Sequence, residues 1–211
     1  MNKDPYKCVA AIYDRIFEPI NKGLRVIGLR MFYPSRDAHV LDIGCGTGTH
    51  LEMYQEFGCS LHGIDTSLSM LEIAKKRLPE NTDLRKGNAT ELPYDTDFFE
   101  LVICMLVLHE MDDDVRSNTL GEITRIVKQN GHILLIDYHT ERPNSAKGWF
   151  IKIFILLSEI AAGIRHFRNY RQFMATGGLL TLIEKTQMKI EKKNITGEGT
   201  MAIYLLTASR A

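Results

Sequence analysis

Two features of the sequence could bind a nucleotide-like ligand: a glycine cluster and an acidic residue that follows it. The cluster is Asp42-Ile-Gly-Cys-Gly-Thr-Gly48, where missing side chains let backbone N–H groups approach a ligand closely. Asp65 lies 21 positions after Gly44, about where an acidic residue of a nucleotide-binding α/β fold accepts hydrogen bonds from ribose hydroxyls. The pair therefore predicts a site for an adenosine-like ligand.

These residues need a sheet to position them, and short apolar runs alternate with helical patterns along the chain. The expected strands span residues 39–43, 60–65, 82–86, 101–106, 132–137, 189–194 and 201–207. The expected helices span about 10–31, 51–57, a segment capped by Ser67, 113–128, and most of 147–185. We predict an α/β, doubly wound, Rossmann-like fold: a seven-stranded, mostly parallel sheet with an antiparallel last strand and helices on both faces.

The length of 211 residues suits one domain. Within it we expect four parts. Residues 1–35 form a helical cover, residues 36–140 the ligand-binding core, residues 141–188 a helical insert, and residues 189–211 the final pair of strands.

Several motifs, in the correct order, resemble those of class I S-adenosylmethionine-dependent methyltransferases. The glycine loop and Ile64-Asp-Thr-Ser-Leu-Ser-Met70 are similar to the first two motifs of that family. Later motifs are matched by Gly87-Asn-Ala-Thr90, by residues 98–103 and by residues 126–131. Residues 12–20 look like the N-terminal helix that covers the cofactor in quinone-biosynthesis and bacterial phospholipid N-methyltransferases. The resemblance implies S-adenosylmethionine as methyl donor and S-adenosylhomocysteine as product.

Carried over residue by residue, the resemblance implies these cofactor contacts: Tyr13, Gly44, Gly46, Thr47, Asp65, Thr66, Met70, Asn88, Ala89 and Met105. Asp65 would accept from the ribose, Met70 would pack on the adenine face, and Asn88 would meet the adenine edge. Much of the family has Asp at the position of Asn88, so the contact here would lack a charge. Met105 replaces a residue that is often small and polar.

A sulfonium donor is already a strong electrophile, so the protein chiefly has to align the nucleophile and exclude water. A base is needed only when the acceptor must lose a proton. His109 follows the fourth strand and His139 the fifth, so we expect both near the mouth of the site. We predict that His109, and after it His139, is catalytic or contacts the acceptor; the alternative is that both are solvated loop histidines.

The insert between the fifth and sixth strands is the usual place for acceptor specificity in this family. Its segment from His166 to Phe173 carries Arg168 and Tyr170, which we predict to contact an anionic or aromatic acceptor. A solvated basic helix is the alternative.

An apolar segment from Gly148 to Ile164 is interrupted by Lys152 and Glu159 and is shorter than the roughly 20 residues of a membrane-spanning helix. We expect it to be a core-packed helix; the alternative is a lid or membrane-leaning helix that handles a greasy substrate. Together with the insert, this segment favours a small apolar or lipid-like acceptor.

Composition restricts which partners, metal sites and cellular locations we expect. The 26 basic and 26 acidic residues balance, and the chain lacks a clear basic-aromatic stripe, so no nucleic-acid partner is expected. Four scattered cysteines without a CxxC pair predict neither a metal site nor a disulfide framework. The N-terminal residues have no uninterrupted apolar core, as a signal peptide would. We expect a cytoplasmic monomer or homodimer with at most peripheral membrane contact.

Two rival functions remain. A nicotinamide-dependent reductase would need the glycine pattern GxGxxG, but Thr49 stands where the third glycine would be. A methyltransferase-fold protein that binds the cofactor or a partner without turnover is the other rival, because fold does not prove activity.

Overall fold

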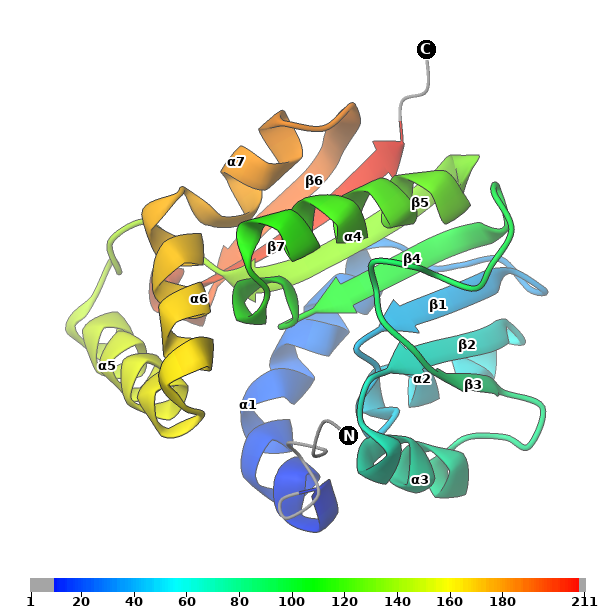
Figure 1. The fold of residues 1–211 in the computed structure, drawn as a ribbon, viewed down its shortest axis with the longest axis horizontal. Helices are drawn as coiled ribbons and strands as arrows, with labels where there is room; N and C mark the ends of the chain where they lie inside the picture. Colours follow the sequence, from blue (N-terminus) through cyan, green and yellow to red (C-terminus); the bar gives the residue numbers. More distant parts are fainter. Residues whose placement is uncertain (1–9, 209–211) are drawn as a thin grey trace.

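The computed structural model describes residues 10–208, apart from the side chains of residues 10–13, 16 and 20. A seven-stranded sheet forms its centre, with the strand order β3-β2-β1-β4-β5-β7-β6 (Figure 1). The strands are β1 (His39–Ile43), β2 (Ser60–Asp65), β3 (Asp83–Lys86), β4 (Phe99–Met105), β5 (Val127–Tyr138), β6 (Met188–Thr196) and β7 (Met201–Ala208).

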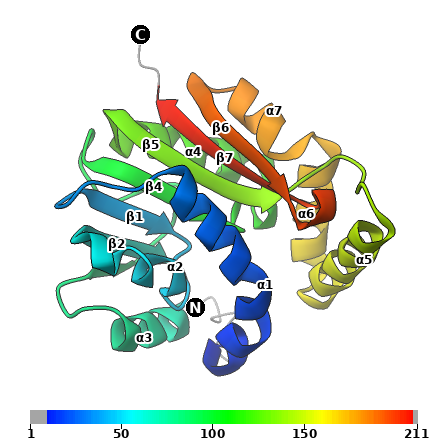
Figure 2. The same ribbon diagram turned by 180° about the vertical axis from the view of Figure 1, so that it is seen from behind.

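The pairing of the strands confirms the predicted fold class. Strands β1 to β5 pair in parallel, whereas β7 is antiparallel to both of its neighbours, β5 and β6. Helices α1 (Ala10–Met31), α2 (Thr49–Glu52) and α3 (Leu68–Arg77) lie on one face. Helices α4 (Asp113–Ile126) and α7 (Gly178–Glu184) lie on the other, as the two opposite views show (Figures 1 and 2).

Local sequence signals explain where the elements begin. Ser67 caps α3 as predicted, because its side chain accepts a hydrogen bond from the backbone N–H of Met70 at 3.2 Å. Asp112 caps α4 in the same way through the N–H of Val115. In β4 the continuous apolar run is buried on both sides, as a central parallel strand requires.

Two elements differ from the prediction by more than a shift of one or two residues. The helix expected over residues 51–57 is split into α2 and a 3-10 turn at Gln55–Phe57. Strand β5 begins at Val127, before the turn expected at Asn130-Gly131. Val127 pairs with Phe99, and His132 pairs with Leu101. Strand β5 therefore has extra residues between these two pairs, which form a bulge.

The insert forms α5 (Ala146–Ala161), α6 (Ile164–Ala175) and α7. The predicted core packing of its apolar segment is wrong. Most of the large apolar side chains of α5 are exposed: Trp149, Phe150, Ile153, Phe154, Leu156, Leu157 and Ile160. Within the described part of the chain, no helix is long and apolar enough to span a bilayer.

The first glycine of the loop after β1 should be intolerant of any side chain. Gly44 has φ 71°, and a Cβ there would overlap the side chain of Val107. We expect Gly44→Ala to lower the free energy of unfolding by about 2 to 5 kcal/mol, because the left-handed backbone costs alanine roughly 1–2 kcal/mol and overpacking adds about 1–3. Urea unfolding at neutral pH measures the change.

Gly121, inside α4, is the matched control, since no described heavy atom lies within 4 Å of a Cβ built there. Gly121→Ala should gain up to about 1 kcal/mol from helix propensity. Equal stability of the two variants would contradict the account of the loop.

Candidate active site

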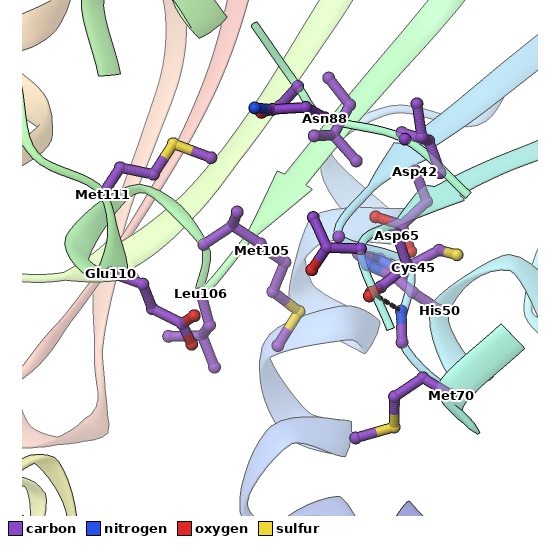
Figure 3. A pocket seen from close by; sticks show the side chains of 18 of the residues that line it. Asp42, Cys45, His50, Asp65, Met70, Asn88, Met105, Leu106, Glu110 and Met111 are labelled. Carbon is purple, nitrogen blue, oxygen red and sulfur yellow. Dashed lines mark hydrogen bonds between the residues drawn. The ribbon is translucent and has the colours of Figure 1, made fainter. Parts of the chain in front are cut away.

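A cavity of about 410 Å³ opens beyond the carboxyl ends of β1, β2 and β4. Strand β1 pairs with β2 on one side and with β4 on the other, so the chain order reverses there and leaves the crevice in which open α/β sheets bind ligands. The volume falls within the range of small-molecule sites. Figure 3 shows its two ends, with Asp65 and His50 on one side, Glu110 and Met111 on the other, and Met105 between them.

The cavity collects nearly all of the predicted cofactor contacts. Its lining includes Gly44, Gly46, Thr47, Asp65, Thr66, Met70, Asn88, Ala89 and Met105. Tyr13 belongs to α1, but its side chain lies outside the described residues. Residues from four separate loops therefore face one space.

The glycine loop presents its backbone to the cavity. Gly44, Gly46 and Gly48 all have positive φ, a conformation that glycine adopts without steric cost. A Cβ on Gly46 would meet no described heavy atom within 4 Å, so this residue is open to the cavity. The loop thus leaves room for a ligand at its second glycine.

Asp65 joins the loop to the end of β2. One carboxylate oxygen accepts from the N–H of Gly46 and the other from the N–H of Ser67, both at 2.8 Å. Each carboxylate oxygen can accept a further hydrogen bond. Asp65 therefore fixes the loop and still offers acceptors to a ligand.

Helix α1 is tied to the same loop. The hydroxyl of Thr47 donates to Asp14 at 2.6 Å. Arg77, at the end of α3, donates to the carbonyl of Thr47 at 2.8 Å and to Asp14 at 2.6 Å. These bonds hold one turn of α1 against the glycine loop.

The lining residues that sequence reasoning missed include three polar ones beside the glycine loop: Arg25, Asp42 and His50. Both ring nitrogens of His50 are buried and have no hydrogen-bond partner among the described residues. Burial, with the nearby charge of Arg25, lowers the pKa of His50 to about 3. Burial raises the pKa of Asp42 to about 8, with Arg25 opposing and Asp65 assisting. Only the tertiary fold brings these groups together, so their spacing carried no signal.

The opposite end of the cavity combines apolar and polar side chains. Its apolar lining comprises Met105, Leu106, Val107, Met111 and Val115, and its polar lining comprises Glu110, Asp112, Arg165 and Asn169. The Asn169 side-chain amide donates to the backbone carbonyl of Glu110 at 2.6 Å. The buried Oδ1 of Asn169 has no partner among the described residues. This end could therefore accept a hydrogen bond from an otherwise apolar molecule.

Neither predicted histidine belongs to the described lining of this cavity. His109 is buried, with Nδ1 2.7 Å from an oxygen of Asp137 and Nε2 3.6 Å from Glu159. Burial opposes its charged form, but Asp137 outweighs this and raises the pKa of His109. His139 lines a separate, smaller cavity beside α7. The expected position of both at the mouth of the site is thus wrong, and a catalytic role for either stays a prediction.

His166 connects the cavity to His109. Its Nε2 lies 3.2 Å from Glu110, and its Nδ1 lies 2.7 Å from Glu159. Burial disfavours the imidazolium, but these two carboxylates raise the pKa of His166 to about 10. The ligand atoms of His109, Glu159 and His166 lie within 4.8 Å of one another, so these side chains could also hold a metal ion.

The structure places the predicted acceptor residues on the expected helix but in the wrong phase. Arg168 is exposed, and Tyr170 is buried against Tyr138, with ring centroids 5.4 Å apart. Arg165 and Asn169 of the same helix line the cavity instead. A helix presents one face to a pocket, and the sequence alone did not fix which face.

Comparison with known proteins supports the predicted family. A family model described as a methyltransferase domain matches residues 41–135. The chain therefore contains a methyltransferase domain. This domain agrees with the predicted cofactor, S-adenosylmethionine.

Relatives and solved structures extend the similarity beyond the matched segment. The chain is 30% identical over 155 residues to a demethylmenaquinone methyltransferase of Listeria welshimeri, an alignment that covers 68% of this methyltransferase and 64% of the relative. It is 32% identical over 104 residues to an uncharacterized methyltransferase of Bacillus subtilis, covering 47% and 40%. The chain thus spans less than two thirds of the length of either relative.

A solved methyltransferase of Thermotoga maritima shares the fold along nearly the whole chain. It aligns with a TM-score of 0.72 at 20% identity, covering 97% of this methyltransferase and 98% of that structure.

The state of His50 should make the cofactor-free methyltransferase sensitive to acid. Its folded-state pKa, about 3, lies below the ordinary value of 6.5, so its contribution to stability is full above pH 6.5 and is lost as the pH falls toward 3. At about 1.4 kcal/mol per pKa unit, we expect about 2 to 3 kcal/mol less stability at pH 4.5 than at pH 6.5 from this group.

Urea unfolding of the wild type and of His50→Leu at both pH values isolates that contribution. Between pH 6.5 and pH 4.5 the His50→Leu variant should lose about 2 to 3 kcal/mol less stability than the wild type loses. Identical losses in both proteins would show that His50 is not buried in its neutral form.

Proposed function

We propose that this methyltransferase transfers the methyl group of S-adenosylmethionine to a small apolar or lipid-like acceptor. The observation that carries the proposal is the division of the cavity. One end holds the glycine loop and Asp65. At the other end Met105, Leu106, Val107 and Met111 give an apolar surface beside the polar groups of Glu110, Asp112, Arg165 and Asn169. The demethylmenaquinone methyltransferases among the relatives agree with an acceptor of this class.

The end with the glycine loop has groups that match each part of the cofactor. Asp65 accepts from the ribose hydroxyls, and Met70 with Ala89 packs against the adenine. Arg25 offers a positive charge to the carboxylate of the methionine portion, and the buried carboxyl group of Asp42 accepts a hydrogen bond from its ammonium group. The unpartnered imidazole of His50, buried in the same lining, gains a polar partner when this portion binds, which removes the cost of leaving it unsatisfied.

Bound S-adenosylmethionine supplies a methyl group on a positively charged sulfur. The protein's task is to place the acceptor atom in line with that group and to exclude water. The apolar side chains around Met105 exclude water, and the free Oδ1 of Asn169 orients an acceptor that carries a hydroxyl or N–H group.

Glu110 is the group best placed to take a proton from the acceptor. It lines the end opposite the glycine loop, and its carboxylate contacts His166 at 3.2 Å. An acceptor that loses a proton as its new bond to carbon forms would pass that proton to Glu110. The cluster of His166, Glu159 and His109 behind it keeps the carboxylate in a fixed position.

Methyl transfer from donor labelled in the methyl group tests the proposed function. The acceptors are a panel of lipids and quinone-like phenols, with nucleic acid and protein as negative controls. We expect label in one lipid or phenol class. Cofactor binding without transfer to any member of the panel would instead favour a non-catalytic methyltransferase-fold protein.

Glu110→Gln should separate catalysis from cofactor binding. We expect kcat to fall roughly 100-fold or more, as for other positioned bases, with the Kd for S-adenosylmethionine within about twofold of the wild type. Glu141→Gln, an exposed carboxylate outside the lining of the cavity, is the control and should leave both constants unchanged. Full turnover by Glu110→Gln would remove this residue from the mechanism.

A further inference from the structure

Helix α5 presents an apolar surface to solvent that the fold leaves uncovered. Phe150 is 73% exposed, Leu157 59% and Phe154 54%. Trp149, Ile153 and Ile160 extend the same side, and Ile164 follows at the start of α6. Soluble monomers rarely expose contiguous apolar patches of this kind unless the patch binds something.

The orientation of α5 is fixed by its opposite side. Gly148, Ile155 and Glu159 are buried against the domain. Glu159 accepts from the Tyr138 hydroxyl at 2.9 Å and pairs with His166. Rotating the helix to hide its aromatic side chains would expose Ile155 and break these buried polar contacts. The apolar side therefore faces outward as a stable feature of the fold.

Within α5 and α6 the charges are almost all positive, although Glu198, outside these helices, lies 3.7 Å from Lys147. Residues 146–175 contain five Lys and Arg residues and one acidic residue, Glu159, although the whole chain carries no net charge. Glu159 is buried, whereas Lys147 at the start of α5 and Arg165, Arg168 and Arg171 on α6 are exposed. An apolar surface flanked by basic side chains complements anionic headgroups above an acyl layer.

We propose that the outer side of α5, with the basic side chains of α6, docks this methyltransferase on the surface of an anionic phospholipid bilayer. The helix lies in the interface and does not span it, because 16 residues extend only about 24 Å against a hydrocarbon core of about 30 Å. Trp149, Phe150 and Phe154 insert at the level of the headgroups, where aromatic side chains are favoured.

Docking in this way brings the cavity close to the bilayer. Helix α6 packs beside α5, as both views show (Figures 1 and 2), and its Arg165 and Asn169 line the end of the cavity opposite the glycine loop. A lipid-like acceptor could then reach Glu110 without crossing bulk water. This consequence rests on the proposed function, but membrane binding itself does not.

Vesicle co-sedimentation without cofactor or acceptor tests the proposal. Vesicles of equal phosphatidylglycerol and phosphatidylcholine should bind the wild type at least tenfold more tightly than pure phosphatidylcholine vesicles, and 0.5 M NaCl should weaken that binding. Phe150→Glu with Phe154→Glu should reduce it at least tenfold. Tyr33→Glu with Ile190→Glu changes two similarly exposed apolar residues outside α5 and should leave it unchanged.

The basic side chains are tested separately by Lys147→Gln with Arg168→Gln, which should weaken binding to anionic vesicles severalfold. Analytical ultracentrifugation covers the competing occupant, a second copy of the chain. The proposal would be overturned if the wild type did not bind vesicles. It would also be overturned if the wild type formed a dimer without binding vesicles and the Phe150→Glu, Phe154→Glu variant were a monomer. Transfer to a water-soluble acceptor remains measurable in either case, so the two proposals fail independently.

Discussion

The site depends on the two hydrogen bonds that the Asp65 carboxylate accepts from the backbone of Gly46 and Ser67. The first holds the glycine loop at the end of β1, and the second sets the start of α3 at the end of β2. Because β1 and β2 are parallel neighbours, one side chain fixes the two turns that face the crevice. Loss of this carboxylate would free both turns and, in the proposed function, remove the acceptor for the ribose.

Around this centre the protein buries polar groups that are not fully satisfied. His50 lacks hydrogen-bond partners among the described residues, as does Oδ1 of Asn169 at the other end of the cavity. Such groups cost stability when buried alone. Their position at opposite ends of one cavity is consistent with sites at which the cofactor and the acceptor supply the missing partners. In the proposed function these unsatisfied groups are part of the binding site.

Sequence reasoning succeeded where a local signal determines a position. The glycine loop, the Ser67 cap and the buried run of β4 each follow from a few adjacent residues, and the order of the motifs along the chain predicts residues that line the cavity. It was wrong where long-range packing decides. The face of α6 that lines the cavity carries Arg165 and Asn169, not the predicted Arg168 and Tyr170. The apolar segment was expected in the core, but Glu159 turns inward to meet Tyr138 and His166, which leaves the aromatic side chains of α5 outside.

Calorimetric titration of the wild type and of Asp65→Ala with S-adenosylmethionine and S-adenosylhomocysteine, with NADH as control, tests whether Asp65 and the glycine loop form the cofactor site. We expect micromolar binding of the first two ligands to the wild type, at least tenfold weaker binding to the variant, and no binding of NADH. Wild-type affinity in Asp65→Ala, or a preference for NADH, would contradict this assignment.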